Sequence, residues 1–251
     1  MDVTFRVLIT GFTPFGRHES NPSGEAAREL GARGSVTVLG PQGRSLIAKI
    51  HAEILDVLWS ISAEGDAPGQ SGAADKIDGL IEELFPDIVI ATGMAETNFR
   101  VEQKAEDRDA ALPDNRRRIP PANRREFPSE PQVLPTSLPV KKIEDAWAKA
   151  GILNVETSAR AGNFLCEDVF YRVMRAGKDQ ARRAKGLRIL RAGFIHVPAP
   201  GHRSVSTIAD ALEIAIRETM LDVSPREYPV DFWEDAQEQL RRVAPRIEND
   251  R

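Results

Sequence analysis

Short β-rich runs and amphipathic helical stretches alternate along most of this sequence, and the alternation limits the folds open to it. Apolar runs of the strand type predict strands at 5–10, 35–39, 87–92, 152–157 and 187–197. Apolar residues at helical spacing predict helices at 23–30, 45–61, 75–84, 140–150, 167–176, 205–220 and 232–243. Strands that alternate with helices build a parallel sheet covered on both faces. The expected fold is therefore α/β, a three-layer α/β/α sandwich around a mainly parallel, twisted sheet.

Residues 1–251 are expected to form one domain. The chain has 251 residues, enough for one large α/β domain or two small ones. The Gly-rich segment 63–72 joins two predicted helices and is interpreted as a connection within the domain. Segment 106–139, rich in Pro, Arg and Asn, predicts a long ordered loop with room for short strands, and such loops are usually functional or mobile. Residues 228–251 are interpreted as a C-terminal extension.

Charge and cysteine content exclude several classes of partner. The net charge is −4 and the pI is near 5.7, which gives no reason to expect nucleic acid or an acidic membrane surface as a partner. No apolar run approaches the length of a membrane span, and the N-terminus is typical of a first strand and not of a signal peptide. A single cysteine excludes an intrachain disulfide and favours a reducing compartment, so we expect the protein in the cytoplasm.

The lone Cys166 directly precedes a predicted amphipathic helix. At such a position a thiol meets unpaired backbone N–H groups and the positive end of the helix dipole, and both favour the thiolate. The same N–H groups can hold an oxyanion. The alternative interpretation is a buried cysteine that acts as a small hydrophobic side chain, which is the commoner role.

Further candidate catalytic residues lie where predicted strands end, at the edge where open α/β sheets bind ligands. His196 lies at the end of one strand, and Glu102 lies just beyond another. A thiol, an imidazole and a carboxylate that orients the imidazole are the parts of a cysteine peptidase. Each residue also has a plainer interpretation, a structural histidine and a solvated charge. No His, Cys and Asp cluster has the spacing of metal ligands, so neither a metal nor another cofactor is expected.

Phe12 and Phe15 flank Thr13 and Pro14 between two glycines, after the first strand. They are interpreted either as loop aromatics folded into the core or as two walls around a small flat ligand.

Six motifs in order resemble pyroglutamyl peptidase type I, the C15 cysteine peptidases. The motifs are Thr10-Gly11-Phe12-x-Pro14-Phe15-Gly16 with Asn21-Pro22-Ser23; Gly93 with Glu102-x-x-Ala105; Leu112-Pro113-Asp114-Asn115; Thr136-x-Leu138-Pro139; Ser158-x-x-Ala161-Gly162-x-Phe164-Leu165-Cys166; and Gly193-Phe194-Ile195-His196-Val197-Pro198. The resemblance implies a triad of Cys166 as nucleophile, His196 as general base and acid, and Glu102 as the residue that orients the imidazole. It also implies a substrate pocket formed by Phe12, Phe15, Asn21, Met94 and Leu165.

The implied reaction is removal of an N-terminal pyroglutamyl (5-oxoprolyl) residue through a thioester, with blocked small peptides as substrates. The resemblance further implies a homo-oligomer, a dimer or a tetramer. Two alternatives remain open at this stage: the same thiol chemistry on a different amide, or a non-catalytic protein that binds 5-oxoproline or a peptide end.

Four positions depart from the family pattern. Met94 stands where the family commonly has glutamine, and Asp107 stands where it has asparagine. Glu167 follows the nucleophile directly, and its charge is expected to raise the cysteine pKa. A basic residue assigned to the oxyanion region aligns with Ala110 or Ala111. The candidates to replace it come from the loop: Arg108 as possible oxyanion support, or Arg116, Arg117 or Arg118.

The loop is locally basic, with Arg116–Arg118 and Arg124–Arg125. The simpler interpretation is a solvated, salt-bridged loop, and the alternative is an oligomer contact or a lid over the substrate.

Overall fold

The computed structural model describes residues 2–61, 72–108, 112–120, 126–152, 155–158, 161–178 and 190–223. The strands span Val3–Phe12 (β1), Ser35–Leu39 (β2), Ser45–Leu55 (β3), Ile88–Met94 (β4), Phe99–Glu102 (β5), Lys104–Glu106 (β6), Val133–Pro135 (β7), Val155–Ser158 (β8) and Arg191–Val197 (β9). The helices span Pro22–Arg33 (α1), Ala73–Leu84 (α2), Val140–Lys149 (α3), Leu165–Gly177 (α4) and Val205–Asp222 (α6), and Pro41–Gly43 forms a 3-10 turn.

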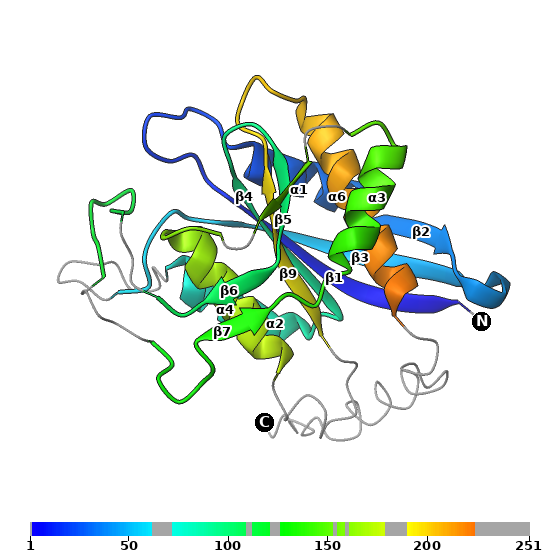
Figure 1. Cartoon of the computed structure of the whole chain (residues 1–251), viewed down its shortest axis with the longest axis horizontal. Coiled ribbons are helices and arrows are strands. Elements are labelled where there is room, and N and C mark those ends of the chain that lie inside the picture. Colours follow the sequence, from blue (N-terminus) through cyan, green and yellow to red (C-terminus); the bar gives the residue numbers. More distant parts are fainter. Residues whose placement is uncertain are drawn as a thin grey trace, which may run out of the picture.

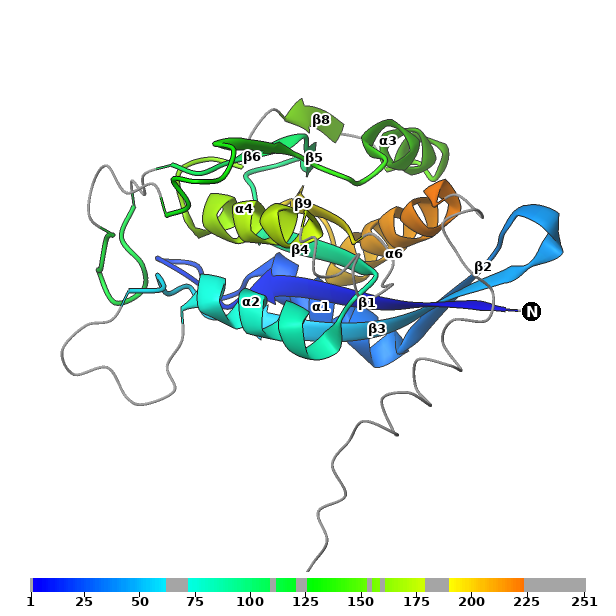
Figure 2. The ribbon, with the colours of Figure 1, turned by 90° about the horizontal axis from the view of Figure 1, so that it is seen from below.

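Seven strands form one sheet in the order β2-β3-β1-β4-β9-β5-β8. The central strands β3, β1, β4 and β9 run parallel to one another. Strand β2 pairs antiparallel with β3, β5 pairs antiparallel with β9, and β8 runs parallel to β5. In Figure 2, β1 and β3 lie toward one end of the sheet, and β5 and β8 lie toward the other. Strands β6 and β7 form a separate antiparallel ribbon.

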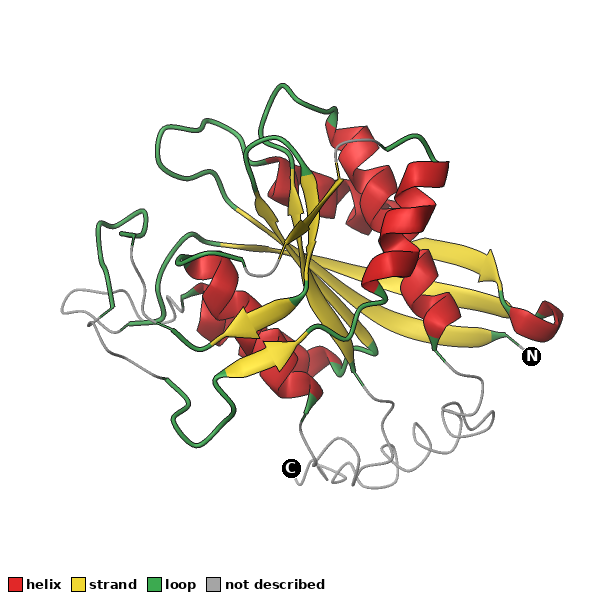
Figure 3. Ribbon diagram, in the orientation of Figure 1, coloured by secondary structure: helices red, strands yellow, loops and turns green. Residues whose placement is uncertain are grey.

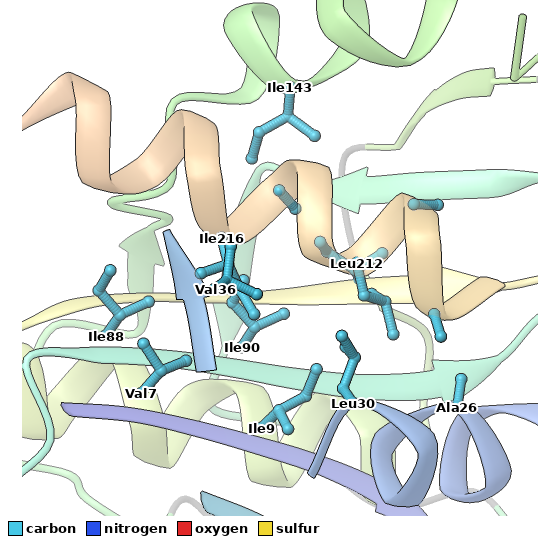
Figure 4. Close-up of a cluster of buried hydrophobic side chains, with 14 of the residues drawn as sticks. Val7, Ile9, Ala26, Leu30, Val36, Ile88, Ile90, Ile143, Leu212 and Ile216 are labelled. Carbon is cyan, nitrogen blue, oxygen red and sulfur yellow. The ribbon is translucent and has the colours of Figure 1, made fainter. Parts of the chain in front are cut away.

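Helices cover both faces of this sheet, as Figure 1 shows. Successive residues of a strand point to opposite faces, so strands covered on both sides are apolar throughout. On β1, Val7 and Ile9 pack toward α1 and α6, whereas Leu8 packs with the cluster that contains α2 and α4. Figure 4 shows the first of these clusters, in which Leu30 and Leu212 lie against the strands. The predicted three-layer sandwich with a mainly parallel sheet is confirmed.

One predicted helix is wrong. Segment 45–61 was expected to be helical because its apolar residues recur at helical spacing, but Ser45–Leu55 is strand β3. It lies between β1 and β2, and pairs with β1 from Leu46 to Leu55 and with β2 from Ser45 to Lys49. Ile47, Ile50 and Ile54 are β-branched and favour a strand, and the pairing with β1 decides the outcome.

The start of α1 also differs from the prediction. The helix predicted at 23–30 begins at Pro22, and its N-cap is Asn21, whose side chain accepts from the N–H of Ser23 at 3.2 Å. Ser23 is buried inside the first turn, and its hydroxyl oxygen accepts from the N–H of Phe12 at 3.2 Å. At position 11, an added Cβ would lie 2.3 Å from the carbonyl oxygen of Ser23, so only glycine permits this approach of β1 to α1.

The long loop runs from the end of β6 to the start of α3, and its described part contains one short strand, β7. The predicted helix at 232–243, the extension 228–251 and most of the connection 63–72 lie outside the described residues. In the parts that the structure describes, no helix is long and apolar enough to cross a membrane.

The parallel strands β1, β4 and β9 end at the same edge of the sheet. Figure 3 shows the loops that follow them gathered at that edge.

Candidate active site

Cys166 is the second residue of α4, and its thiol faces the end of β4. The helix begins after Phe164, whose backbone is extended, and Glu167 and Asp168 place negative charge in its first turn, where it is favourable. An added Cβ at Gly93 would lie 2.8 Å from Cys166 Sγ. The thiol therefore packs directly over Gly93 on β4, and a side chain at that position would displace it.

His196 and Glu102 form a buried pair beside this thiol. Nδ1 of His196 lies 2.7 Å from Oε1 of Glu102, and the side chains are 9% and 1% exposed. Since a carboxylate only accepts hydrogen bonds, Nδ1 carries the proton and Nε2 is left for another partner. Gly93 is the register neighbour of His196 on β4, so the thiol above Gly93 lies next to the imidazole.

Glu102 reaches the imidazole by a route that the sequence did not predict. It was expected just beyond the strand at 87–92, but it ends β5, which runs antiparallel to β9. In that register Arg100 lies opposite His196, and Glu102, two residues further, points to the same face. The carboxyl group thus meets the imidazole as a diagonal cross-strand neighbour.

Burial dominates the electrostatics of the thiol. It raises the pKa of Cys166 to about 12, Glu102 and Glu167 add to the rise, and the N–H at the helix start lowers it. The expected unfavourable effect of Glu167 is confirmed in direction. The resting site therefore holds a neutral thiol, which forms a thiolate only when a base takes its proton.

Glu167 is buried because it joins two segments around the site. Its Oε1 accepts from the N–H of Glu106 at 2.6 Å, and its Oε2 accepts from the N–H of Ala161 at 3.0 Å. Burial raises the pKa of Glu167 to about 7, although these N–H groups and Arg108 act in the opposite direction. The acidic residue after the nucleophile therefore fixes the loop that leads into α4.

The two phenylalanines after β1 have different positions. Phe12 is 4% exposed and belongs to the core cluster, whereas Phe15 packs at the pocket rim, 6.0 Å from the ring of Phe164 and 5.6 Å from that of His18. Asn21 donates to the carbonyl oxygen of Thr13 at 3.1 Å and so supports this loop.

An open pocket of about 540 Å³ lies at this edge. Its lining comprises Phe15, His18, Met94, Ala95, Glu96, Arg100, Ala161, Gly162, His196 and Ala199. Of the predicted pocket residues, the structure places Phe15 and Met94 in the lining. Phe12 and Leu165 are buried, at 4% and 1% exposure, and Asn21 is buried in its capping role.

Arg108 contacts the loop before the nucleophile. Its Nη1 donates to Oδ1 of Asn163 at 2.8 Å, and its Nη2 pairs with Glu106 at 2.9 Å. It lines a smaller cavity of about 40 Å³ beside Glu167 and not the open pocket. Its proposed oxyanion role stays a prediction, and Ala110 and Ala111 lie outside the described residues.

The basic loop is held by buried acids. Asp114 accepts from Arg118 Nε at 3.1 Å and from the N–H of Trp59 at 3.1 Å. Burial alone would raise the pKa of Asp114, but the N–H groups of Arg118, Trp59 and Arg116 lower it. Asp107 accepts from the N–H groups at positions 126 and 127, both at 3.1 Å. For Arg118 the salt-bridged interpretation fits, whereas Arg124 and Arg125 lie outside the described residues.

Three residues near the site received no role from the sequence. Asn115 donates to the carbonyl oxygen of Pro14 at 2.9 Å, Gly93 makes room for the thiol, and Arg100 lines the pocket. Gly93 and Asn115 stood in the motifs quoted above, which was the available signal, and Arg100 carried none. No group of three or more His, Cys, Asp or Glu in the described residues could hold a metal ion.

Comparisons with known proteins agree with this geometry. A family model described as pyroglutamyl peptidase matches residues 69–219. A pyrrolidone-carboxylate peptidase of Pseudomonas fluorescens is 31% identical and covers 91% of this chain and 96% of its own length. One from Chromobacterium violaceum is 34% identical, over 76% of this chain and 77% of its own. The crystal structure of pyroglutamyl peptidase I from Bacillus amyloliquefaciens superposes with a TM-score of 0.68 at 26% identity, covering 88% of this chain and 96% of that chain.

Proposed function

The chain belongs to the pyroglutamyl peptidase family, and on that premise we propose that Cys166, His196 and Glu102 remove the N-terminal pyroglutamyl residue from peptides. The chain is a cysteine omega peptidase. The observation that carries the assignment of roles is the 2.7 Å pair of His196 and Glu102 beside a thiol seated on Gly93.

In the first step, Nε2 of His196 takes the proton of Cys166 while the sulfur attacks the pyroglutamyl carbonyl carbon. Glu102 holds the imidazole in the tautomer that leaves Nε2 free and stabilises the imidazolium that forms. Because burial raises the pKa of the thiol, attack requires a base to take its proton, and His196 is that base. The first N–H groups of α4, beside Cys166, are the donors that we propose for the oxyanion.

In the second step, His196 gives the proton to the departing amine, and the C–N bond breaks to leave a thioester on Cys166. Water then attacks the thioester carbonyl, with His196 again as the base, and releases 5-oxoproline and the free thiol.

Selectivity for a blocked N-terminus follows from the apolar end of the pocket, which Phe15 and Met94 line. Phe15 and Met94 offer apolar surface to the lactam ring, a neutral group. Between these two side chains a free α-ammonium would lose hydration, which costs several kcal/mol where no partner replaces the water. Asp107, one of the departures from the family pattern, accepts from the N–H groups of residues 126 and 127.

The test exploits the single cysteine. Wild-type protein should release the chromophore from a pyroglutamyl anilide, and Cys166→Ser and Cys166→Ala should not. Alkylation modifies Cys166 alone, because the chain has no other thiol, and should abolish turnover. A Cys166→Ser variant at the wild-type rate, with its fold verified by thermal unfolding, would overturn the proposal.

Two further features stay at the level of proposal. A homo-oligomer, a dimer or tetramer, is implied by the resemblance, and light scattering on the purified chain would measure its mass. Action in the cytoplasm is supported by the free thiol of Cys166, which a reducing compartment preserves; fractionation of cells would locate it.

A further inference from the structure

The open pocket crosses four neighbouring strands, and their order separates its two ends. Phe15 follows β1, Met94 ends β4, His196 lies on β9 and Arg100 lies on β5. The sheet order β1-β4-β9-β5 therefore runs from the aromatic end, past the thiol and the imidazole, to the guanidinium of Arg100.

This strand order places the leaving group of the substrate toward β5. If the pyroglutamyl ring lies against Phe15 and Met94, as the proposed function requires, the scissile bond lies over Cys166 at the end of β4. The departing amine must face His196 on the next strand, because the imidazole protonates it. The rest of the peptide then continues toward Arg100.

The guanidinium of Arg100 is held in place and keeps two donor groups available. Its Nε donates to Oε2 of Glu156 at 2.8 Å, and the other oxygen of Glu156 accepts from Nδ2 of Asn98 at 2.7 Å. The terminal nitrogens of Arg100 have no hydrogen-bond partner among the described residues, and the side chain is 32% exposed. A guanidinium fixed through Nε presents the geometry that a carboxylate accepts.

The distance along the substrate is short enough for this contact. Arg100 is the direct cross-strand neighbour of His196, and such pairs have Cβ atoms about 5 Å apart. In a pyroglutamyl dipeptide, the carboxyl carbon lies only about 2.5 Å from the amine nitrogen that His196 protonates. A carboxylate on the first residue of the leaving group is therefore within reach of an arginine side chain.

We propose that Arg100 binds a carboxylate carried by the residue that follows pyroglutamate, which makes it a specificity-determining residue for short or acidic substrates. The proposal rests on the proposed function. The carboxylate has two possible sources, the α-carboxylate of a dipeptide and the side chain of an acidic residue. Glu96, which follows β4, lines the same pocket and carries the same charge as the substrate carboxylate. The carboxylate is therefore accommodated on the β5 side, away from the end of β4.

The experiment compares wild-type protein with Arg100→Gln on four substrates. They are pyroglutamyl-alanine, its C-terminal amide, pyroglutamyl-glutamate amide and pyroglutamyl-glutamine amide. The wild-type KM for a carboxylate substrate should be about fivefold below that of its uncharged counterpart, the size of a partly exposed charge-assisted pair. Arg100→Gln should remove this difference by raising the KM of the carboxylate substrates, and its effect should fall on KM more than on kcat, because the bound carboxylate takes no part in bond making or breaking.

Amidation also changes the basicity of the departing amine. The readout is therefore the ratio of the KM values of the two substrates in a pair, measured for the wild type and divided by the same ratio for Arg100→Gln. Arg217→Gln is the matched control: Arg217 also pairs through Nε with a glutamate, Glu213 at 3.2 Å, but it lies on α6 and outside the pocket lining. It should preserve the wild-type ratio.

An Arg100-dependent advantage for pyroglutamyl-alanine alone identifies the α-carboxylate, and one for pyroglutamyl-glutamate amide identifies the acidic side chain; either supports the proposal. Equal KM ratios in wild type and Arg100→Gln would overturn it while pyroglutamyl substrates are still cleaved. Failure to cleave any of the four would instead reject the proposed function. If Arg100→Gln does not fold, equal wild-type KM values for both substrate pairs would suffice to reject the contact.

Discussion

A methyl group added at Gly93 would occupy the space in which the thiol lies. In Gly93→Ala, the new Cβ would be 2.8 Å from Cys166 Sγ and 2.9 Å from the ring of Phe194. Ordinary contacts need about 3.5–4.0 Å, so the thiol, the ring or the strand must move by roughly 1 Å. A reacting group misplaced by about 1 Å loses about a hundredfold in rate.

We therefore expect Gly93→Ala to lower kcat on a pyroglutamyl anilide by about a hundredfold, with a small change in KM, because Met94 and Phe15 keep their places. Overpacking of this kind should also reduce the free energy of unfolding by about 1–3 kcal/mol, which urea denaturation would measure.

Gly79→Ala is the control. Gly79 lies within α2, and an added Cβ there would meet nothing within 4 Å, so the change should stabilise the protein by up to about 1 kcal/mol and leave kcat unchanged. A Gly93→Ala variant with wild-type kcat would refute the placement of the thiol over β4.

Three other changes test the surroundings of the triad. Glu102→Gln replaces an acceptor with a group that can also donate to Nδ1, so the wrong imidazole tautomer becomes accessible. The kcat should therefore fall by at least about a hundredfold. An unchanged pH–rate profile with wild-type kcat would exclude the role of Glu102. Because burial raises the pKa of Glu167 from 4.5 to about 7, the native state binds this proton more tightly than the unfolded chain. The free energy of unfolding should therefore fall by up to about 3 kcal/mol between pH 4.5 and pH 7. Glu167→Gln should flatten that dependence, and it should also lower the pH midpoint of Cys166 alkylation, since Glu167 raises the pKa of the thiol. Asn115→Ala removes the hydrogen bond to the carbonyl oxygen of Pro14 and frees the loop that carries Phe15. It should raise KM about fivefold with kcat nearly unchanged, and an unchanged KM in steady-state kinetics on the anilide would show that the loop is irrelevant to binding.

The residues that the sequence predicted best are those whose signal is local. Local patterns reveal the buried runs of β4 and β9 and the amphipathic stripe of α4. The motifs around Cys166 and His196 adjoin these elements in the sequence. The helix prediction for segment 45–55 failed for the opposite reason, because its signal is not local. Its apolar spacing fits a helix, and the choice of strand depends on pairing with β1, which no local pattern reveals.

The contacts that complete the site are likewise long-range. That Glu102 approaches His196 from an antiparallel strand, and that Arg100 stands opposite the imidazole, depends on the register of β5 against β9. The support that Asn115 gives to the loop after β1 joins segments about a hundred residues apart. Sequence spacing identifies such residues only through a family motif, and Arg100 belonged to none.

The proposed mechanism requires Cys166 to form a thioester with the pyroglutamyl group. Intact-mass spectrometry after an acid quench, during turnover of a pyroglutamyl aryl ester, tests it directly, because an activated ester acylates faster than the thioester hydrolyses. We expect a pyroglutamyl adduct that maps to the peptide containing Cys166 and that is absent after alkylation. Full turnover by protein whose Cys166 is completely alkylated would contradict it.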